Sequence, residues 1–348
     1  MYTIRDVARL AQVSTATVSL VCSGKRGVSE ELRRRVLEAV EALDYRPNQV
    51  ARSLRARRTR IIGMIVPVLT HPFFAEIMRA AEDEARRCGY SVIFCNSNED
   101  PELERQHLDN LFARRVDGVL LSSSFPLYGE GRLVKWRLPL VYFDRIPRGF
   151  SGAAVVSDNL AGAREATRHL IKLGHTRIAI ITGPLGMRIC ADRLEGFRQA
   201  LQEARLPLPA EYLRRGNFKS ESGYRCGCEL MRLPNPPTAV FCCNSSMTLG
   251  LMRALAKLDI ACPDRVSVLG FDDFEWVASF RPQLTAVAQP TYEMGKQATQ
   301  MLVREIEQEK GEAGATKDGI VVLPNELRIR ESTAPPYRSS PVQVGAGA

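Results

Sequence analysis

The stretch that decides the fold of the N-terminal end reads TIRDVARLAQVSTATVSLV and covers residues 3–21. Its apolar residues recur at helical spacing after a Thr-x-x-Asp capping pattern, which predicts a first helix over residues 4–11. Ser14 is a good N-cap for a second helix over residues 15–21, which begins three or four residues after the first one ends. The stretch therefore predicts two short helices joined by a tight turn.

A third helix completes this predicted head. Ser29-Glu-Glu-Leu begins an amphipathic stretch whose apolar stripe runs from Leu32 to Leu43, so we expect a compact three-helix unit. The second helix turns small or hydroxylated residues and one leucine outward. Such side chains admit a helix into a DNA major groove and donate to phosphates. The outward residues are Thr15, Ala16, Thr17, Ser19 and Leu20.

Positive charge is concentrated at the same end of the 348-residue chain. Residues 1–60 contain thirteen Lys or Arg and six Asp or Glu, so they hold +7 of the net charge of +9. Charge alone would sooner indicate a solvated basic face. A localised basic end that also has the spacing of a helix-turn-helix favours a nucleic-acid partner.

Residues 47–59 are the predicted hinge between the head and the rest of the chain. They contain helix formers but few apolar side chains, and so short and basic a helix is marginal alone. It would form against DNA and a second copy of the chain, with Leu54 as a wedge between base steps. The alternative is that Leu54 is a linker leucine that rests on the core.

These segments resemble the lac repressor family almost from end to end, because TIRDVA, VSTATVS, YRPN and ARSL match its head and hinge. The resemblance implies a transcriptional repressor that binds double-stranded operator DNA as a homodimer, since one head reads half of a palindromic site. Leu20 departs from the many members with a polar or basic residue there, because an aliphatic group can contact a thymine methyl but cannot pair with guanine. The DNA-binding set so implied is Thr3, Ser14, Thr15, Ala16, Thr17, Ser19, Leu20, Lys25, Arg26, Asn48, Arg52, Ser53, Leu54 and Arg55.

From residue 61 onward, apolar β-like runs alternate with helical stretches, which predicts parallel sheets covered by helices. The expected fold class is an all-α three-helix helix-turn-helix head plus a hinge helix, followed by an α/β core. The family resemblance implies that this core has two lobes, like a periplasmic binding protein. The expected domains are residues 1–46 for DNA binding, 47–59 for the hinge, 60–332 for ligand binding and dimerisation, and 333–348 as a disordered tail. Lobe one is expected over about residues 60–160 and 290–320, and lobe two over about 161–289 and 321–332.

Residues that follow the predicted strands define a candidate ligand site, because ligands of such folds lie beyond the carboxyl ends of the strands. They offer aromatic faces and planar hydrogen-bonding groups, the chemistry that a monosaccharide site requires. Singly, each residue has a structural explanation such as core packing, ion pairing or helix capping. As a set they resemble the site of the ribose-binding protein and of the ribose repressors, which implies that Phe73 and Phe74 flank a sugar ring. The set is His71, Phe73, Phe74, Asp144, Arg145, Arg193, Phe218, Asn244, Asp272 and Gln289.

Two positions depart from that resemblance: His71 stands where the ribose binders have Asn, and Ser245 where most family members have Asp. The effector expected is nevertheless a ribose-like monosaccharide. The purine repressors are the closest alternative in overall resemblance, but their base-recognising arginine falls at Met187 in this chain, with Arg188 one place away. A partner protein docking near residues 284–290 remains a further alternative.

Other classes of protein are less well supported. A sugar-binding transport protein would need a signal peptide and has no use for residues 1–60. The sequence contains no Gly-x-Ser-x-Gly elbow, phosphate loop or His-Glu-x-x-His, so we expect no enzyme. The nine scattered cysteines are typical of reduced thiols, and we expect no metal and no cofactor. With no window near the length of a membrane span, the expected location is the cytoplasm, on the nucleoid when bound to DNA.

Overall fold

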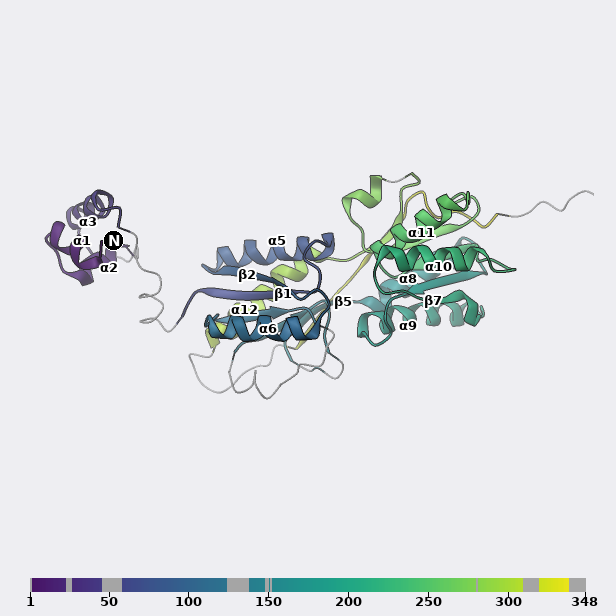
Figure 1. Ribbon diagram of the computed structural model, residues 1–348, viewed down its shortest axis with the longest axis horizontal. Helices are drawn as coiled ribbons and strands as arrows, with labels where there is room; N and C mark the ends of the chain where they lie inside the picture. The colour runs from purple at the N-terminus through teal and green to yellow at the C-terminus, as the bar shows by residue number, and fades with distance from the viewer. Residues whose placement is uncertain are drawn as a thin grey trace, which may run out of the picture. The chain divides into compact units, whose positions relative to one another are not determined.

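The computed structural model describes residues 2–22, 27–45, 58–123, 138–147, 150, 152–279, 281–308 and 319–337 (Figure 1). The chain divides into two units, Met1–Arg60 and Ile61–Ala348. The expected hinge helix over residues 47–59 falls almost wholly on residues 46–57, which lie outside the described residues, as does the tail after residue 337.

Three helices form the head, as the sequence predicts: α1 (Ile4–Leu10), α2 (Thr15–Cys22) and α3 (Glu30–Ala42). The capping pattern closes the start of α1, because the backbone N–H and the hydroxyl of Thr3 both donate to Asp6 Oδ2, at 2.9 and 2.7 Å. Gln12 takes a positive φ of 51° in the turn between α1 and α2. That left-handed residue reverses the chain within four residues, which gives the helix-turn-helix.

A small apolar core holds the three helices together. Val7, Val18 and Val36 contribute one fully buried side chain from each helix. Arg35 of α3 adds a polar contact, since its Nη2 donates to the carbonyl of Ala11 at 2.6 Å. The end of α1 is therefore tied to α3, and α2 is left with one face outward.

Lobe one of the core is a six-stranded sheet with strand order β11-β5-β4-β3-β1-β2, parallel throughout. Helices α5 and α12 pack together on one face, whereas α6 covers the other face (Figure 1). Its elements are β1 (Ile61–Val66), α5 (Pro72–Arg87), β2 (Ser91–Asn96), α6 (Pro101–Ala113), β3 (Gly118–Leu121), β4 (Leu140–Phe143), β5 (Ala154–Ser157), α12 (Thr291–Gln308) and β11 (Ile320–Leu323).

Lobe two repeats this architecture around a second six-stranded sheet with strand order β12-β10-β9-β8-β6-β7. Helices α8 and α9 pack as one pair, and α10 and α11 as another. Only the edge strand β12 is antiparallel in this sheet. The elements are α8 (Asn159–Lys172), β6 (Ile178–Thr182), α9 (Arg188–Glu203), η1 (Ala210–Tyr212), β7 (Leu213–Arg215), α10 (Ser220–Met231), β8 (Ala239–Cys242), α11 (Ser245–Lys257), β9 (Ser267–Phe271), η2 (Glu275–Ser279), β10 (Thr285–Ala288) and β12 (Glu326–Arg328).

The chain crosses between the lobes after β5, after β10 and after β11. The boundary expected at about residue 320 lies a few residues later in the structure, because Ile320–Leu323 pairs along its whole length with β5 of lobe one. Leu323 at its end is buried in the lobe-one core. The chain therefore returns to lobe two only after this strand, because its apolar run completes the edge of the first sheet.

The start of the expected disordered tail is also wrong. The backbone of Ala334 is held on lobe two, since its N–H donates to Ser267 Oγ at 3.0 Å and its carbonyl lies 2.9 Å from His175 Nε2. The hydroxyl of Thr333 lies 3.0 Å from His169 Nε2. Partners buried in lobe two thus order residues 333–337, and sequence composition gives no sign of such distant partners.

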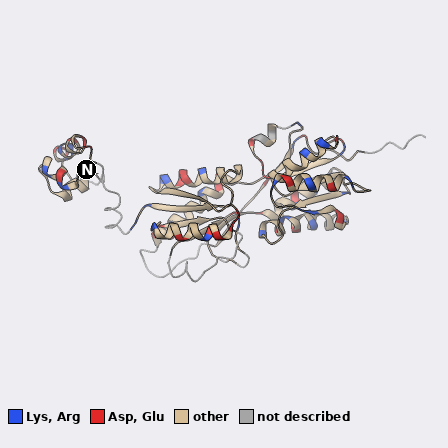
Figure 2. Ribbon diagram, viewed as in Figure 1, with Lys and Arg blue, Asp and Glu red and all other residues tan. Residues whose placement is uncertain are grey.

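Acidic and basic residues are interspersed along the outer faces of α5 and α6 (Figure 2), where they form ion pairs such as Arg86 with Asp83 and Arg105 with Asp109. This even pattern matches the near-neutral charge of the chain after residue 60. Among the described residues, no helix combines the length and the apolar character that crossing a membrane would require.

Candidate functional site

The outward face of α2 is the candidate DNA interface. Thr15, Ala16 and Ser19 are exposed, and the Leu20 side chain keeps 38% of its accessible surface. Thr17 is half-buried, and its hydroxyl lies 2.9 Å from Ser14 Oγ. This face is small and nearly uncharged, which allows the helix to approach base edges closely.

Two other predicted DNA contacts serve as helix caps in the head. Ser14 Oγ accepts from the backbone N–H of Thr17 at 3.1 Å, and Thr3 binds Asp6 as described above. Both residues are exposed, so capping leaves them on the surface. The remaining predicted contacts lie outside the described residues: Lys25, Arg26, Asn48, Arg52, Ser53, Leu54 and Arg55.

The predicted ligand residues lie together where the carboxyl ends of strands from the two lobes meet. At the start of α5, Phe73 and Phe74 are buried edge to face, with ring centroids 5.0 Å apart. His71 caps this helix, since its Nδ1 accepts from the backbone N–H of Phe73 at 3.3 Å. Its Nε2 lies 3.4 Å from Ser245 Oγ of lobe two. Burial lowers the pKa of His71, so the ring is neutral at pH 7 and forms a contact between the lobes.

Arg193 is the cation of the lobe-two side, and only 3% of its surface is exposed. Its Nε donates to Asn159 Oδ1 at 2.8 Å and its Nη1 to the carbonyl of Cys243 at 2.5 Å. The guanidinium carbon lies 3.6 Å from the centroid of the Phe271 ring. A buried cation held by three partners keeps one position, so Arg193 is an ordered anchor.

Asn244 is both a helix cap and a site residue. Its Oδ1 accepts from the backbone N–H of Met247 at 2.9 Å at the start of α11, and its Nδ2 donates to the carbonyl of Phe218 at 3.2 Å. The capping explanation is therefore correct for this residue. The same two bonds fix the loop that places the Phe218 ring.

A chain of hydrogen bonds joins Asp272, Gln289 and Ser157. Gln289 Nε2 donates to Asp272 Oδ1 at 2.6 Å, and Ser157 Oγ donates to Gln289 Oε1. Ser157 ends β5 of lobe one, whereas Asp272 follows β9 of lobe two. This series of hydrogen bonds therefore spans two of the crossovers between the lobes and couples the carboxylate of Asp272 to both lobes.

Asp144 and Arg145 follow β4 on the lobe-one side. Burial raises the pKa of Asp144 to about 6 despite the nearby Arg145 and Arg193. Arg145 Nη1 donates to both carboxylate oxygens of Glu99 at 3.0 Å, and its Nε lies 3.6 Å from Asp144 Oδ2. Its guanidinium carbon lies 5.7 Å from the ring centroid of Phe74 and 5.2 Å from that of Phe218. Arg145 thus contacts aromatic rings of both lobes.

Three of the predicted ligand residues have a left-handed backbone conformation. Asp144, Phe218 and Asp272 have φ angles of 58°, 64° and 78°, in the left-handed region that residues other than glycine rarely adopt. Each lies just after a strand, where the conformation turns its side chain toward the cleft. Strain of this kind persists where the surrounding structure holds it, and it is frequent at functional sites.

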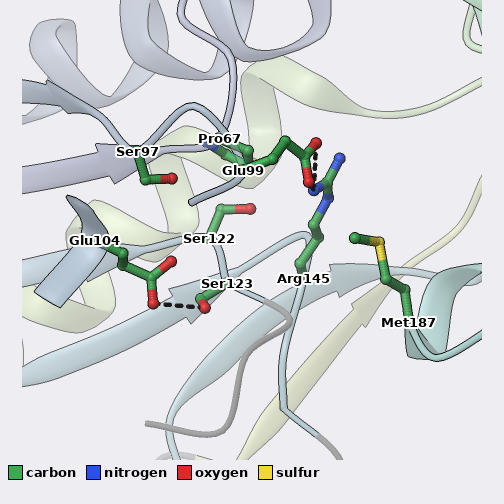
Figure 3. Close-up of a pocket in the computed structure, with 8 residues that line it drawn as sticks. All are labelled: Pro67, Ser97, Glu99, Glu104, Ser122, Ser123, Arg145 and Met187. Atoms are coloured by element: carbon green, nitrogen blue, oxygen red, sulfur yellow. Dashed lines mark hydrogen bonds and ion pairs between the residues drawn. The ribbon is translucent and has the colours of Figure 1, made fainter. Parts of the chain in front are cut away.

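Sequence reasoning missed a polar pocket on the lobe-one side of the same cleft (Figure 3). Its lining includes Met187, which the sequence marked only as the place of a missing arginine. A signal was available, because Ser97 and Ser122 directly follow β2 and β3. The pocket is lined by Pro67, Ser97, Glu99, Glu104, Ser122, Ser123, Arg145 and Met187.

Hydrogen bonds, an ion pair and ring contacts join seven of the ten predicted ligand residues: His71, Phe73, Phe74, Asp144, Arg145, Phe218 and Asn244. The other three, Arg193, Gln289 and Asp272, are linked through Asn159 and Ser157. Electrostatic interactions of Asp272 with His71 and of Arg193 with Asp144 join the two sets into one cluster of two carboxylates, two guanidiniums, two amides and aromatic rings. Such a cluster can hold a polar ring by hydrogen bonds at its edge and packing on its face. A helix-turn-helix head followed by a two-lobed α/β core with a ligand cleft defines the class of ligand-responsive transcriptional regulators.

Comparison with known proteins identifies the family. Residues 3–48 match the model of bacterial regulatory proteins of the lacI family, and residues 167–333 match a periplasmic binding protein-like domain. The chain is 38% identical, over 95% of its length and 99% of the relative, to the HTH-type transcriptional repressor PurR of Histophilus somni. The chain belongs to the lacI family and is a ligand-responsive transcriptional repressor.

Two solved structures extend the likeness to the whole fold. The lac repressor dimer bound to operator and the anti-inducer ONPF matches with a TM-score of 0.85 at 27% identity, covering 96% of this chain and 99% of that one. The complex of the transcriptional regulator CelR with cellobiose matches with a TM-score of 0.71 at 32% identity, covering 95% of this chain and 100% of that one. These matches confirm the predicted fold class.

Proposed function

We propose that this repressor binds a palindromic operator as a homodimer and that a ribose-like sugar in the cleft controls its affinity for DNA. The observation that carries the proposal is the single cluster of carboxylates, guanidiniums and aromatic rings drawn from both lobes. A ligand that bonds to both lobes favours one arrangement of them, and such a shift can be transmitted to a dimeric DNA-binding head. The lac repressor dimer on its operator supports the mode of assembly.

The sugar hypothesis rests on the polar groups of the cleft. Asp144 and Asp272 can each accept from two neighbouring hydroxyls, and Arg193 can donate to a ring or hydroxyl oxygen. Phe74 and Phe218 offer apolar faces from opposite lobes. The relative solved with cellobiose supports a sugar as the effector class. We propose that the cleft binds the sugar without converting it chemically, so a bound sugar should be recovered unchanged.

A purine corepressor is the second candidate, favoured by the 38% identity to a repressor named PurR. Against it stands Met187 at the start of α9, the position at which the purine repressors carry their base-recognising arginine. A thioether is only a weak acceptor and cannot donate to a base. Met187→Arg should therefore raise affinity for hypoxanthine or guanine if the rest of the cleft accepts a purine.

Calorimetric titration of the full chain with ribose, related pentoses, hexoses, hypoxanthine and guanine tests the effector. We expect heat with a sugar, and at least a tenfold loss of affinity in Asp144→Asn and in Asp272→Asn, each of which replaces an acceptor with a donor. The matched control is Asp264→Asn on the surface of lobe two, which should bind as the wild type does. If only the purines gave binding heat, the effector would be a purine corepressor and the sugar hypothesis would be wrong.

The operator is tested by selecting bound DNA from a random pool with and without the sugar. On the proposed assignment, α2 reads the major groove and residues 47–59 form the hinge, with Leu54 in the minor groove. Leu20 should favour thymine where a polar residue would favour another base, so Leu20→Arg should shift the selected half-site toward guanine. Failure to enrich any palindrome would overturn the DNA-binding proposal. The function places the protein in the cytoplasm, on the nucleoid when it is bound to its operator.

A further inference from the structure

The pocket of Figure 3 lies at the carboxyl edge of the lobe-one sheet, beside the cleft. We call Ser97, Ser122, Ser123 and Glu104 the serine pocket. The first three follow β2 and β3, and Glu104 comes from the first turns of α6. Figure 3 shows the hydroxyls of Ser97 and Ser122 directed toward the middle of the pocket, with the side chain of Arg145 on its other side.

Two buried polar atoms of this lining have no hydrogen-bond partner among the described residues. Ser122 is fully buried, and its Oγ is unpartnered. The Nε of Arg145, which is nearly buried, is also without a hydrogen bond, although it lies 3.6 Å from Asp144 Oδ2. Burying a polar group without a partner is unfavourable. Two such atoms in one pocket indicate that a polar group of a ligand forms the missing hydrogen bonds.

Glu104 is a buried acceptor in the same lining, with 4% of its surface exposed. Its Oε1 accepts from Ser123 Oγ at 2.7 Å, and burial raises the pKa of the carboxyl to about 7. The nearest charged residues of the lining, Glu99 and Arg145, bind each other instead. The Glu104 carboxyl can therefore accept a further hydrogen bond from a group that enters the pocket.

We propose that the serine pocket binds a free terminal hydroxyl of the effector. A hydroxyl both accepts and donates, so it can accept from Arg145 Nε and pair with Ser122 or Glu104. An ammonium group offers no acceptor to Arg145, and a methyl group leaves the polar atoms unpaired. A phosphate would lie against the carboxylates of Glu99 and Glu104. The effector is on this basis an unphosphorylated sugar, and this inference rests on the sugar assignment made above.

Access to the serine pocket depends on Arg145 and Met187. Both side chains line the pocket on its cleft side. Met187 belongs to lobe two and Arg145 to lobe one, so separation of the lobes would uncover the serines. Closure around the effector would then bury its terminal hydroxyl.

Calorimetry with matched sugars tests the inference on the full chain. The sugar that binds most tightly is compared with its terminal deoxy and terminal phosphate analogues, on the wild type and on Ser122→Ala. We expect the deoxy analogue to bind the wild type about tenfold more weakly, and the phosphate to give no heat. Ser122→Ala should weaken binding of the parent sugar severalfold and leave the affinity for the deoxy analogue unchanged. Ser91→Ala, on the exposed start of β2, is the matched control.

Ser122→Ala has a second readout that keeps the test decisive. Since the described residues give this hydroxyl no hydrogen-bond partner, its removal should leave the melting temperature of the ligand-free chain unchanged or raise it. A fall of several degrees would show that Ser122 has a structural partner and would overturn the inference. Equal binding of parent and deoxy sugars would also overturn it while the sugar assignment stands. Absence of binding by every sugar would overturn both.

Discussion

The lobe-two and lobe-one sides of the cleft are built differently. On the lobe-two side, Arg193 is held by two hydrogen bonds and an aromatic ring, and both ends of the Asn244 amide are bonded. On the lobe-one side, Ser122 Oγ and Arg145 Nε have no hydrogen-bond partner among the residues that the structure describes, and burial raises the pKa values of Asp144 and Glu104. One side is bonded before the effector arrives, whereas the other holds groups whose bonding or protonation can change.

This difference indicates a division of roles. A pre-bonded anchor loses little conformational freedom when a ligand binds, so the lobe-two side can supply affinity. Carboxyls with pKa values near 6 and 7 respond to pH and to the groups placed beside them. The lobe-one side therefore supplies selectivity. The three predictions that follow test this division, from the largest expected effect to the smallest.

Replacing the anchor should cause the largest loss. Arg193→Met removes a buried cation and leaves Asn159 Oδ1 and the carbonyl of Cys243 without their donor. It also removes one of the two cations, Arg145 and Arg193, that lower the pKa of Asp144. We expect the free energy of unfolding to fall by about 3 to 5 kcal/mol, measured by denaturant unfolding with circular dichroism. Sugar binding should be lost with it.

The matched control is Arg188→Met on the same helix, because its side chain is 44% exposed and pairs with Asp192 at 3.5 Å. Exposed pairs contribute little, so this change should cost less than about 1 kcal/mol. If the two variants lost the same stability, Arg193 would not be the anchor described here.

Glu104→Gln should change how stability depends on pH. The folded-state pKa of Glu104 is about 7 against an ordinary value of 4.5, so the folded protein holds a proton between these values that the unfolded chain has released. The contribution of Glu104 to stability therefore falls by about 3 kcal/mol as pH rises from 4.5 to 7. The Gln variant has no such proton, so its stability relative to the wild type should rise through this window and level off above pH 7.

Unfolding titrations at several pH values between 4 and 8 measure the effect. Glu102→Gln on the same helix is the control, since the hydrogen bond from Arg105 lowers the pKa of exposed Glu102 to about 2. Glu102 stays ionised throughout the window, so the free energy of unfolding of Glu102→Gln should change with pH in the same way as that of the wild type. If the free energy of unfolding of Glu104→Gln also changed with pH as that of the wild type does, the pKa of the buried Glu104 carboxyl would not be raised.

Glu99→Gln should have the smallest effect. It weakens the ion pair that holds Arg145 over the serine pocket, but the Glu99 side chain is 32% exposed and screened by solvent. We expect a loss of about 1 kcal/mol, seen as a fall of a few degrees in melting temperature. Glu82→Gln on α5, whose pair with Arg86 is exposed, should show no measurable change. If Glu99→Gln lost as much stability as Arg193→Met, the lobe-one and lobe-two sides of the cleft would not differ as described.

Local signals were sufficient for most of the fold. The caps at Thr3, Ser14 and Ser29 predicted where α1, α2 and α3 begin, because a cap is satisfied by residues two or three places away. Buried parallel strands such as β1 and β9 were visible as continuous apolar runs. The edge strand β11 was misplaced because the residues with which it pairs lie more than 160 positions earlier in the chain.

The candidate site was predictable only in part. Polar and aromatic residues at strand ends were predicted to form a site, and in the structure hydrogen bonds, ring contacts and electrostatic interactions link them. The partners that fix them, such as Asn159 for Arg193 and Glu99 for Arg145, were missed because each lies 34 or 46 positions away. Ser122 and Glu104 were missed because serine and glutamate are ordinary surface residues until burial removes their water.

By itself, the sequence determined the helix-turn-helix head, the alternation of strands and helices, and the family, because these depend on periodicity, capping and motifs within short spans. Only the tertiary structure decided which groups of the cleft are bonded and which are not. It showed Arg193 held by two hydrogen bonds and the Phe271 ring, and Ser122 buried with no hydrogen-bond partner among the described residues. It also showed Glu104 in a buried place, which raises the pKa of its carboxyl to about 7. These properties arise when residues distant in the sequence exclude water together, and no single segment contains that information.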